Sequence, residues 1–372
     1  MSGGGVPTPV PEAWSLKKLR SISRPFLSPA PNPTLMEVNE WVWPSHCHQH
    51  AAVLRHGQLL RWMDVAACLS AERHAQMPCV TVSVDNITFQ SCVKVGHVVI
   101  LKAVVYRSFK SSLEVGLVVE SEDPFSGSRQ HICKAFFVFV AKPSDGAKVQ
   151  LPTLSPVTEE EKREFLLAAE RRRMRTTYAK DIMRLVKNIH REKKRTSSLP
   201  SVLPSRCVSA ADTAVHTVQI VLPVHANHHG TTFGGQIMEW MTDVATLSGL
   251  RLSRSPLKLE GIESIYFRGP SHVGERVSLR SSVNRTFSGN RFEVGVRVEG
   301  YTVGGETRHI NSAFFTFQLE DQSITLPQLL LETPVEKERA ANATARHYLW
   351  LDRMAIQFEE RQVSLSSENA VS

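Results

Sequence analysis

Two stretches of the chain carry apolar residues at the spacing of a buried helix. The first follows Gly57 in GQLLRWMDVAACLS, and the second follows Gly235 in GQIMEWMTDVATLS. Apolar positions that recur three and four residues apart predict helices, and small or apolar residues on nearly every side predict that both helices are buried. These positions are Leu59, Leu60, Met63, Ala66 and Ala67 in the first stretch, and Ile237, Met238, Met241, Val244 and Ala245 in the second.

Runs rich in Val, Ile and Phe follow each predicted helix. In the first half they read CVTVSVDNITF, VVILKAVVYRSF, LEVGLVVESED and CKAFFVFVAK. Their alternation, and the turn residues between them, predict antiparallel strands. A buried helix wrapped by a curved antiparallel sheet is the hotdog arrangement, so the expected fold class is α+β.

The chain contains two copies of this pattern. Four matches occur in order, at Gly57/Gly235, Val95/Val273, Glu114/Glu293 and Ala135/Ala313, with a spacing of 178 positions that becomes 179 only at the glutamates. Self-similarity at a fixed spacing indicates a repeated domain of roughly 110 residues. We therefore expect two tandem hotdog domains that pair edge to edge as a pseudo-dimer.

The repeat also sets the expected domain boundaries. Thr158 and Glu161 stand at capping-box spacing, which predicts a helix between the two copies, followed by a charged linker rich in Pro and Ser. After Leu326 one more helix is expected. The predicted parts are a disordered segment 1–35, a first hotdog domain 36–150, a helix and linker 151–209, a second hotdog domain 210–325 and a tail 326–372.

Composition limits the broad class. A length of 372 residues and an apolar fraction of 42% suit two cores plus connectors, and no apolar run approaches the ~18 residues of a membrane span. The six scattered cysteines favour a reducing compartment. We expect a cytoplasmic protein; because the N-terminal segment weakly resembles a transit peptide, the mitochondrial matrix is the alternative.

The net charge of +8 comes largely from Ser15 to Arg24 and from Arg171 to Arg195. A nucleic-acid partner would require a motif as well as charge, and no zinc finger, RNP or KH signature is present. An anionic small ligand is the other interpretation.

The loop VHANHHGTTFGGQ before the second helix could suggest a metal site or a phosphate-binding site. His225, His228 and His229, with His46, Cys47, His48 and His50 of HCHQH, could suggest zinc. Adjacent histidines point apart in extended chain and no helix supplies a partner at the right pitch, so we expect no metal site. The sequence motifs GxGxxG and GK[ST] are absent, so neither a dinucleotide-binding site nor a P-loop is expected.

Gly234 and Gly235 stand at the start of the second predicted helix and suggest a different kind of site. Amide groups at a helix start are unpaired and lie at the positive end of the helix dipole, and glycine allows close approach. The pair therefore predicts either an oxyanion site suited to acyl transfer or only a tight turn.

Several segments together resemble a known family. LPVHANHHGTTFGGQIMEWM, YFRGPSHVGERV and RHINSAFFTF resemble the C-terminal hotdog of the vertebrate double-hotdog (type II) acyl-CoA thioesterases. LLRWMDVAACLSAERHAQMPCVTVSVDNITF and LAAERRRMR resemble their N-terminal hotdog and interdomain helix. The resemblance covers roughly residues 33–355, and is greatest to the group of the brown-fat-inducible thioesterase and the cytosolic acetyl-CoA hydrolase.

The resemblance implies an aspartate and an asparagine from opposite domains, here Asp64 and Asn227. Asp64 is expected to act as general base toward water and Asn227 to orient that water or the thioester carbonyl, while amides near Gly235 stabilise the oxyanion. No cofactor and no metal are expected. The expected reaction is hydrolysis of acyl-CoA to free fatty acid and CoA.

The repeat predicts a single working site. The position that matches Asp64 is Thr242, and Asp243 lies about 100° further round the helix. The first domain's loop has His48 where the asparagine would stand, and it lacks the Gly-Gly pair. Between its proline and Gly-Gln it is also one residue longer than the family pattern. We expect the reciprocal site to have decayed.

The resemblance also implies the contacts of CoA. They are Val82, Ser83 and Val84; Ser111, Ser112 and Leu113; Arg173; and Phe267, Arg268 and Gly269. Strand edges and hydroxyls suit the pantetheine arm, and arginines suit the phosphates. For the RRRMR run around Arg173, a solvated helix face is the alternative.

Two departures from the family pattern accompany these expectations. Thr231 replaces an asparagine expected in GNTFGG, and the chain ends at Ser372 without the START domain of the brown-fat and cytosolic relatives. The resemblance implies a trimer of chains. Alternative functions are an acyl-CoA-binding sensor without catalysis and, more remotely, a hotdog dehydratase.

Overall fold

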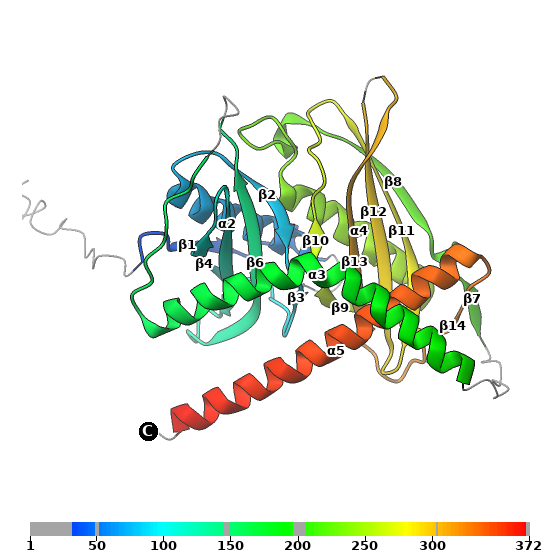
Figure 1. Ribbon diagram of the computed structural model, residues 1–372. Helices are drawn as coiled ribbons and strands as arrows, with labels where there is room; N and C mark the ends of the chain where they lie inside the picture. The colour runs from blue at the N-terminus through cyan, green and yellow to red at the C-terminus, as the bar shows by residue number, and fades with distance from the viewer. Residues whose placement is uncertain (1–31, 49–51, 144–148, 196–205, 303, 370–372) are drawn as a thin grey trace, which may run out of the picture.

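The computed structural model describes residues 32–48, 52–143, 149–195, 206–302 and 304–369. Most of the expected N-terminal segment, His50 and part of the linker lie outside these residues. Within them, two curved sheets each surround one helix, and two long helices cross both sheets on one side (Figure 1). The described helices include none that is long and apolar enough to cross a membrane.

The elements follow the predicted repeat. The first half contains β1 (Met36–Trp41), η2 (Pro44–His46), α2 (His56–Ala75), β2 (Cys79–Val84), β3 (Ile87–Thr88), β4 (Val98–Ser108), β5 (Ser112–Glu122) and β6 (Arg129–Ala141). The second contains β7 (Cys207–Ser209), η3 (Ala211–Thr213), β8 (Val215–Ile220), η4 (Pro223–His225), α4 (Gly234–Ser253), β9 (Leu257–Ile262), β10 (Ile265–Tyr266), β11 (Arg276–Phe287), β12 (Arg291–Tyr301), β13 (Thr307–Leu319) and β14 (Gln328–Leu330).

Each half contributes one short strand to the other half's sheet. One sheet has the order β1-β4-β5-β6-β2-β10 and the other the order β3-β9-β13-β12-β11-β8. Strand β10 pairs with β2, and β3 pairs with β9. A free sheet edge is a site of unwanted pairing, so this exchange covers the β2 and β9 edges and joins the halves. The expected α+β fold with paired tandem domains is confirmed.

Helices α2 and α4 form the buried centre. All ten apolar positions predicted for their cores are at most 3% exposed. The two helices cross closely because a glycine stands at each contact. A Cβ atom on Gly235 would lie 2.8 Å from the Arg61 Cα, and one on Gly57 would lie 3.1 Å from the Glu239 Cα. Glycine is required here by the approach of backbone to backbone.

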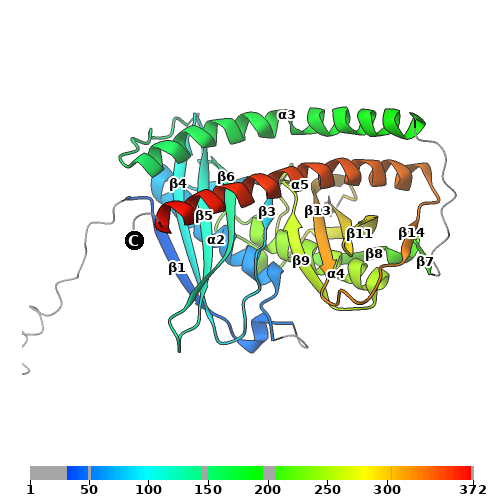
Figure 2. The ribbon, with the colours of Figure 1, turned by 90° about the horizontal axis from the view of Figure 1, so that it is seen from below.

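The long helices α3 (Glu159–Arg195) and α5 (Pro334–Asn369) cover the sheets from outside (Figure 2). The predicted capping box is present: the Glu161 amide donates to the Thr158 hydroxyl and the Thr158 amide donates to the Glu161 carboxylate, both at 3.1 Å. Helix α3 continues to Arg195, into the segment expected to be linker, because the charged residues there have good helix propensity.

Arginines on both long helices pair with buried glutamates of the sheets. Arg171 and Arg175 of α3 contact Glu114, each at 2.7 Å, and Arg346 of α5 contacts Glu293 at 2.7 Å. Glu114 and Glu293 are 0% and 2% exposed, so these contacts satisfy charges that would otherwise be costly to bury.

Replacing Gly235 with alanine tests the helix crossing. Because the new methyl group meets the backbone of Arg61, we expect the free energy of unfolding to fall by about 1–3 kcal/mol. Thermal or urea unfolding measures the change. Gly269→Ala is the control, since nothing lies within 4 Å of its Cβ position. Equal stability of the two variants would contradict the account.

Candidate functional site

A pocket of about 470 Å³ opens between the two halves of the molecule. Its wall combines α2, β2 and the end of β6 with the loop before α4 and the turn after β10. The lining residues are Cys68, Cys79, Val80, Thr81, Val82, Lys142, Pro143, Asn227, His228, His229, Thr231, Thr232, Phe233, Gly234, Ile237 and residues 267–272. Both halves are therefore required to form it.

Asp64 lies on α2 behind the part of the wall formed by Thr81 and Gly234. Its side chain is 0% exposed. The Thr81 hydroxyl donates to Asp64 Oδ1 at 2.9 Å, and the Gly235 amide donates to Oδ2 at 2.7 Å. Burial raises the pKa of Asp64 to about 6, and these two hydrogen bonds limit the rise. The carboxylate is thus ionised but basic near neutral pH.

Asn227 lies in the pocket wall on the loop before α4. Its side-chain oxygen accepts hydrogen bonds from the His229 amide at 3.0 Å, the Thr231 amide at 3.2 Å and the Thr231 hydroxyl at 3.2 Å. These bonds fix the amide plane. The Nδ2 group donates to no described residue, so it can donate to a ligand.

The two glycines before α4 have separate roles. The Gly235 amide donates to Asp64, so among the amides expected near Gly235 this one holds the carboxylate. The Gly234 amide donates to no described residue, and Gly234 lines the pocket. Neither glycine has a positive φ, so neither is required here for a left-handed backbone conformation.

Glycine at 234 allows the backbone to lie directly against the Asp64 carboxylate. A Cβ atom at this position would lie 2.9 Å from Asp64 Oδ2 and 3.3 Å from the Thr81 hydroxyl. Any larger residue would therefore fill the space next to the carboxylate.

Four of the expected CoA contacts lie on this pocket, namely Val82, Phe267, Arg268 and Gly269. The Phe267 amide donates to the Val82 carbonyl at 2.9 Å, which brings the two segments together. Arg268 is exposed and forms no ion pair with a described residue. Its guanidinium is therefore free to bind an anion.

The remaining expected CoA contacts lie outside the pocket lining. Ser83, Val84 and Leu113 are at most 3% exposed, so they are buried within the protein. Ser111 lies in the turn from β4 to β5 and its carbonyl accepts from the Ala141 amide, and Ser112 begins β5, where it pairs with Val140 of β6. Arg173 is 75% exposed and pairs with Glu170 of its own helix. This agrees with the alternative that the run around Arg173 is a solvent-exposed helix face.

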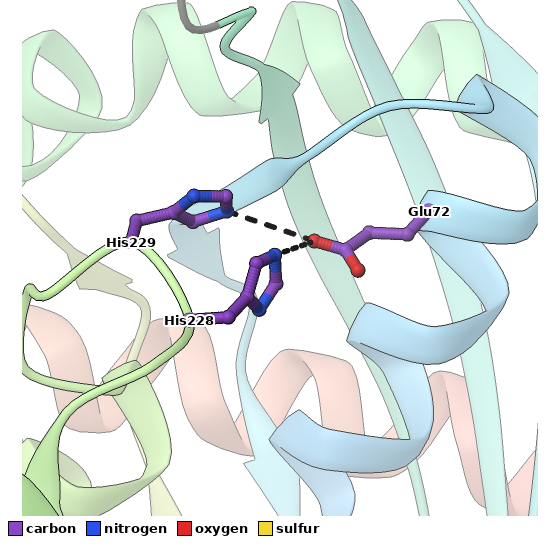
Figure 3. A group of neighbouring side chains, drawn as sticks. All are labelled: Glu72, His228 and His229. Atoms are coloured by element: carbon purple, nitrogen blue, oxygen red, sulfur yellow. Dashed lines mark ion pairs between the residues drawn. The ribbon is translucent and has the colours of Figure 1, made fainter.

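The histidines differ from the expectation. His225 accepts a hydrogen bond from the Leu222 amide and packs edge-on against Trp240. His228 and His229 do not point apart, because the chain turns at 227–230, where the Gly230 amide donates to the Asn227 carbonyl. Their ring centroids lie 3.8 Å apart, and both rings point toward Glu72 of α2 (Figure 3). The reason for excluding a metal is therefore wrong.

The reciprocal position holds a larger pocket, of about 1110 Å³. Thr242 stands where Asp64 would be, and its hydroxyl bonds to the Met238 carbonyl of its own helix. His56 occupies the position of Gly234, and Leu259 that of Thr81. Asp243 does line this pocket, contrary to expectation, but it faces Arg55 at 3.9 Å.

Two functional residues were not predicted. Thr81 orients Asp64, and the repeat could have revealed it, since its counterpart Leu259 cannot donate a hydrogen bond. Glu72 lies eight residues after Asp64 on the same helix, and therefore on the same face. No sequence pattern pairs it with a loop 156 positions away.

Comparison with known proteins agrees with the expected family. Residues 52–125 match the family model described as the thioesterase superfamily. Mouse acyl-coenzyme A thioesterase 11 is 45% identical over 90% of this chain, and the match spans 56% of that relative's length. An uncharacterized acyl-CoA thioester hydrolase, YkhA of Bacillus subtilis, is 33% identical over 32% of this chain and 69% of its own.

A solved structure extends the fold match. The putative oleoyl thioesterase from Lactobacillus plantarum aligns with a TM-score of 0.50, covers 78% of this chain and 98% of its own, and is 10% identical. The match covers most of both halves, as expected for a tandem arrangement.

The buried carboxylate predicts a pH-dependent cost to stability. Folding raises the pKa of Asp64 from 3.8 to about 6, so the ionised form destabilises the folded state, fully above pH 6 and progressively less as the pH falls toward 4. In Asp64→Asn, the amide oxygen can accept from Gly235 while its nitrogen donates to Thr81. We expect this variant to be more stable at pH 8, on the order of 1–3 kcal/mol.

Thermal unfolding at pH 8 and pH 5 measures this gain, and the exposed Asp212→Asn is the control. A gain that is the same at both pH values would contradict the assignment.

Proposed function

Because this chain belongs to the acyl-CoA thioester hydrolases of the thioesterase superfamily, we propose that it hydrolyses acyl-CoA to a free acid and CoA. The observation that carries the proposal is the carboxylate of Asp64, held by the opposite half's Gly235 amide next to a pocket lined by Asn227. The chain spans 56% of the mouse relative's length, and the proposal concerns the part that the two share.

Asp64 serves as general base in the proposed reaction. It removes a proton from water as the oxygen attacks the thioester carbonyl carbon. The C–S bond then breaks, the CoA sulfur leaves with the bonding pair, and the proton on Asp64 returns to it as CoA-SH forms. Thr81 is a positioning residue, because its hydroxyl fixes one carboxylate oxygen.

Asn227 and Gly234 supply the remaining polar groups. The Nδ2 group of Asn227 and the amide of Gly234 lie on the pocket wall and donate to no described residue, and the helix dipole of α4 adds positive potential near Gly234. Donors fixed before the substrate arrives stabilise the oxyanion without reorganisation. Water is the only co-reactant.

A kinetic test follows the release of CoA from acyl-CoA substrates of several chain lengths. Asp64→Asn should lower kcat by about 10²–10⁴-fold, and Asn227→Ala by about 10²–10³-fold. The wild-type kcat/KM should fall tenfold per pH unit below about pH 6, where Asp64 becomes protonated.

The matched control is Asp243→Asn in the reciprocal pocket. Burial raises the pKa of Asp243 to about 6 as well, so the pH profile alone does not separate the two sites. We expect this variant to keep its activity within about twofold. Full activity in Asp64→Asn would refute the mechanism. Tight acyl-CoA binding without CoA release in the wild type would favour the sensor alternative instead.

The phosphates of CoA are proposed to contact Arg268. Because Arg268 lines the pocket and pairs with no carboxylate of the described chain, Arg268→Ala should raise KM for acyl-CoA by roughly tenfold, with a smaller effect on kcat. Arg173→Ala should change KM by less than about twofold, since its partner is Glu170. Steady-state kinetics of both variants decides between them, and a larger effect at Arg173 would reinstate the contact inferred from the family.

A further inference from the structure

We propose that Glu72, His228 and His229 form a binding site for a divalent transition-metal ion of the zinc class at the mouth of the pocket. Glu72 comes from the first half of the chain, and both histidines come from the second (Figure 3). The ligand atoms of all three lie within 4.8 Å of one another.

Both distances are compatible with ligands of one ion, and the longer one does not fit a hydrogen bond. His228 Nε2 lies 3.2 Å and His229 Nε2 lies 3.8 Å from Glu72 Oε1. Ligands about 2.0–2.1 Å from a tetrahedral zinc ion lie roughly 3.3 Å apart. A separation of 3.8 Å is too long for a hydrogen bond, and His229 Nε2 is buried with no hydrogen-bond partner among the described residues.

The surroundings support both the ligand set and its orientation. The Cys79 amide donates to Glu72 Oε1 at 3.0 Å, so the carboxylate is held by an outer hydrogen bond, as is common for metal ligands. The Asn227 turn fixes the two histidines. Two imidazoles and a carboxylate select zinc, cobalt or nickel over magnesium and calcium, which prefer oxygen.

The position indicates regulation and not catalysis. Glu72 follows Asp64 by eight residues, which places it about 12 Å further along α2. An ion held by Glu72 would thus be displaced along α2 from Asp64, toward the loop that carries Asn227. It would tie the loop that carries Asn227 to α2 across the pocket mouth, where Cys68, His228 and His229 line the wall. The reciprocal position is Leu250, which cannot bind a metal.

The direct test is zinc binding to the full chain, measured by competition with a chromophoric chelator. We expect a site of micromolar or tighter affinity that millimolar magnesium does not occupy. Glu72→Gln and His229→Gln should each weaken it at least about tenfold; the glutamine keeps an oxygen for the Cys79 amide. His272→Gln is the matched control, because His272 lines the same pocket and faces a single carboxylate, Glu275, at 3.6 Å.

Cobalt supplies a second readout. Its visible absorption should report bound nitrogen and oxygen ligands in the wild type and in His272→Gln, and should be lost in Glu72→Gln and His229→Gln. Zinc affinity that is equal in all four proteins would overturn the site.

The effect on hydrolysis rests on the proposed function and is measured separately. Zinc at a saturating level should slow CoA release at least several-fold in the wild type and in His272→Gln, and much less in Glu72→Gln. Unchanged hydrolysis with the site occupied would overturn the regulatory role. Because metal binding is measured without substrate, a chain that proves inactive toward acyl-CoA would refute the proposed function and leave the metal test intact.

Discussion

The hydrogen bond from the Gly235 amide to the Asp64 carboxylate is the contact on which the site depends. It joins the two halves of the chain at 2.7 Å. The bond forms because α2 and α4 lie very close together, so close that any side chain at position 235 would clash with the backbone of Arg61. One glycine thus sets the helix crossing, aims the carboxylate and satisfies a buried charge. Pairing of β2 with β10 also joins the same two halves.

The repeat explains why two similar pockets differ in chemistry. Duplication places equivalent residues at both helix crossings, and Gly57 is retained against Glu239 as Gly235 is against Arg61. The polar residues have diverged. Asp64, Thr81 and Gly234 on one side correspond to Thr242, Leu259 and His56 on the other. Both helix crossings are therefore kept, while the carboxylate, its hydrogen-bond donor and the glycine that lies against it occur together at only one of them.

The sequence predicts the parts of this structure that depend on local pattern and repetition. Helical spacing identified α2 and α4 and their buried residues, and the constant spacing identified the paired domains. The resemblance identified Asp64 and Asn227, which the structure places behind and on the wall of one pocket. The sequence could not predict where individual amide groups and side chains point. Whether the amide of Gly234 or of Gly235 faces the pocket depends on how the helices cross, and the turn that brings His228 and His229 to Glu72 depends on a side-chain hydrogen bond of Asn227.

The basic run of α3 shows why charge in a sequence needs a structure to interpret it. Arg171 and Arg175 point inward to Glu114, whose side chain is fully buried, and Arg346 of α5 does the same for Glu293. These arginines compensate buried carboxylates, and removing one would leave an unpaired charge in the core. They are consequently unavailable for an anionic ligand. Among the described residues, the arginine and lysine side chains that line the pocket are Arg268 and Lys142, and no described carboxylate pairs with either. If the pocket binds the phosphates of CoA as proposed, their recognition would depend on these few groups and not on the basic run of the helix.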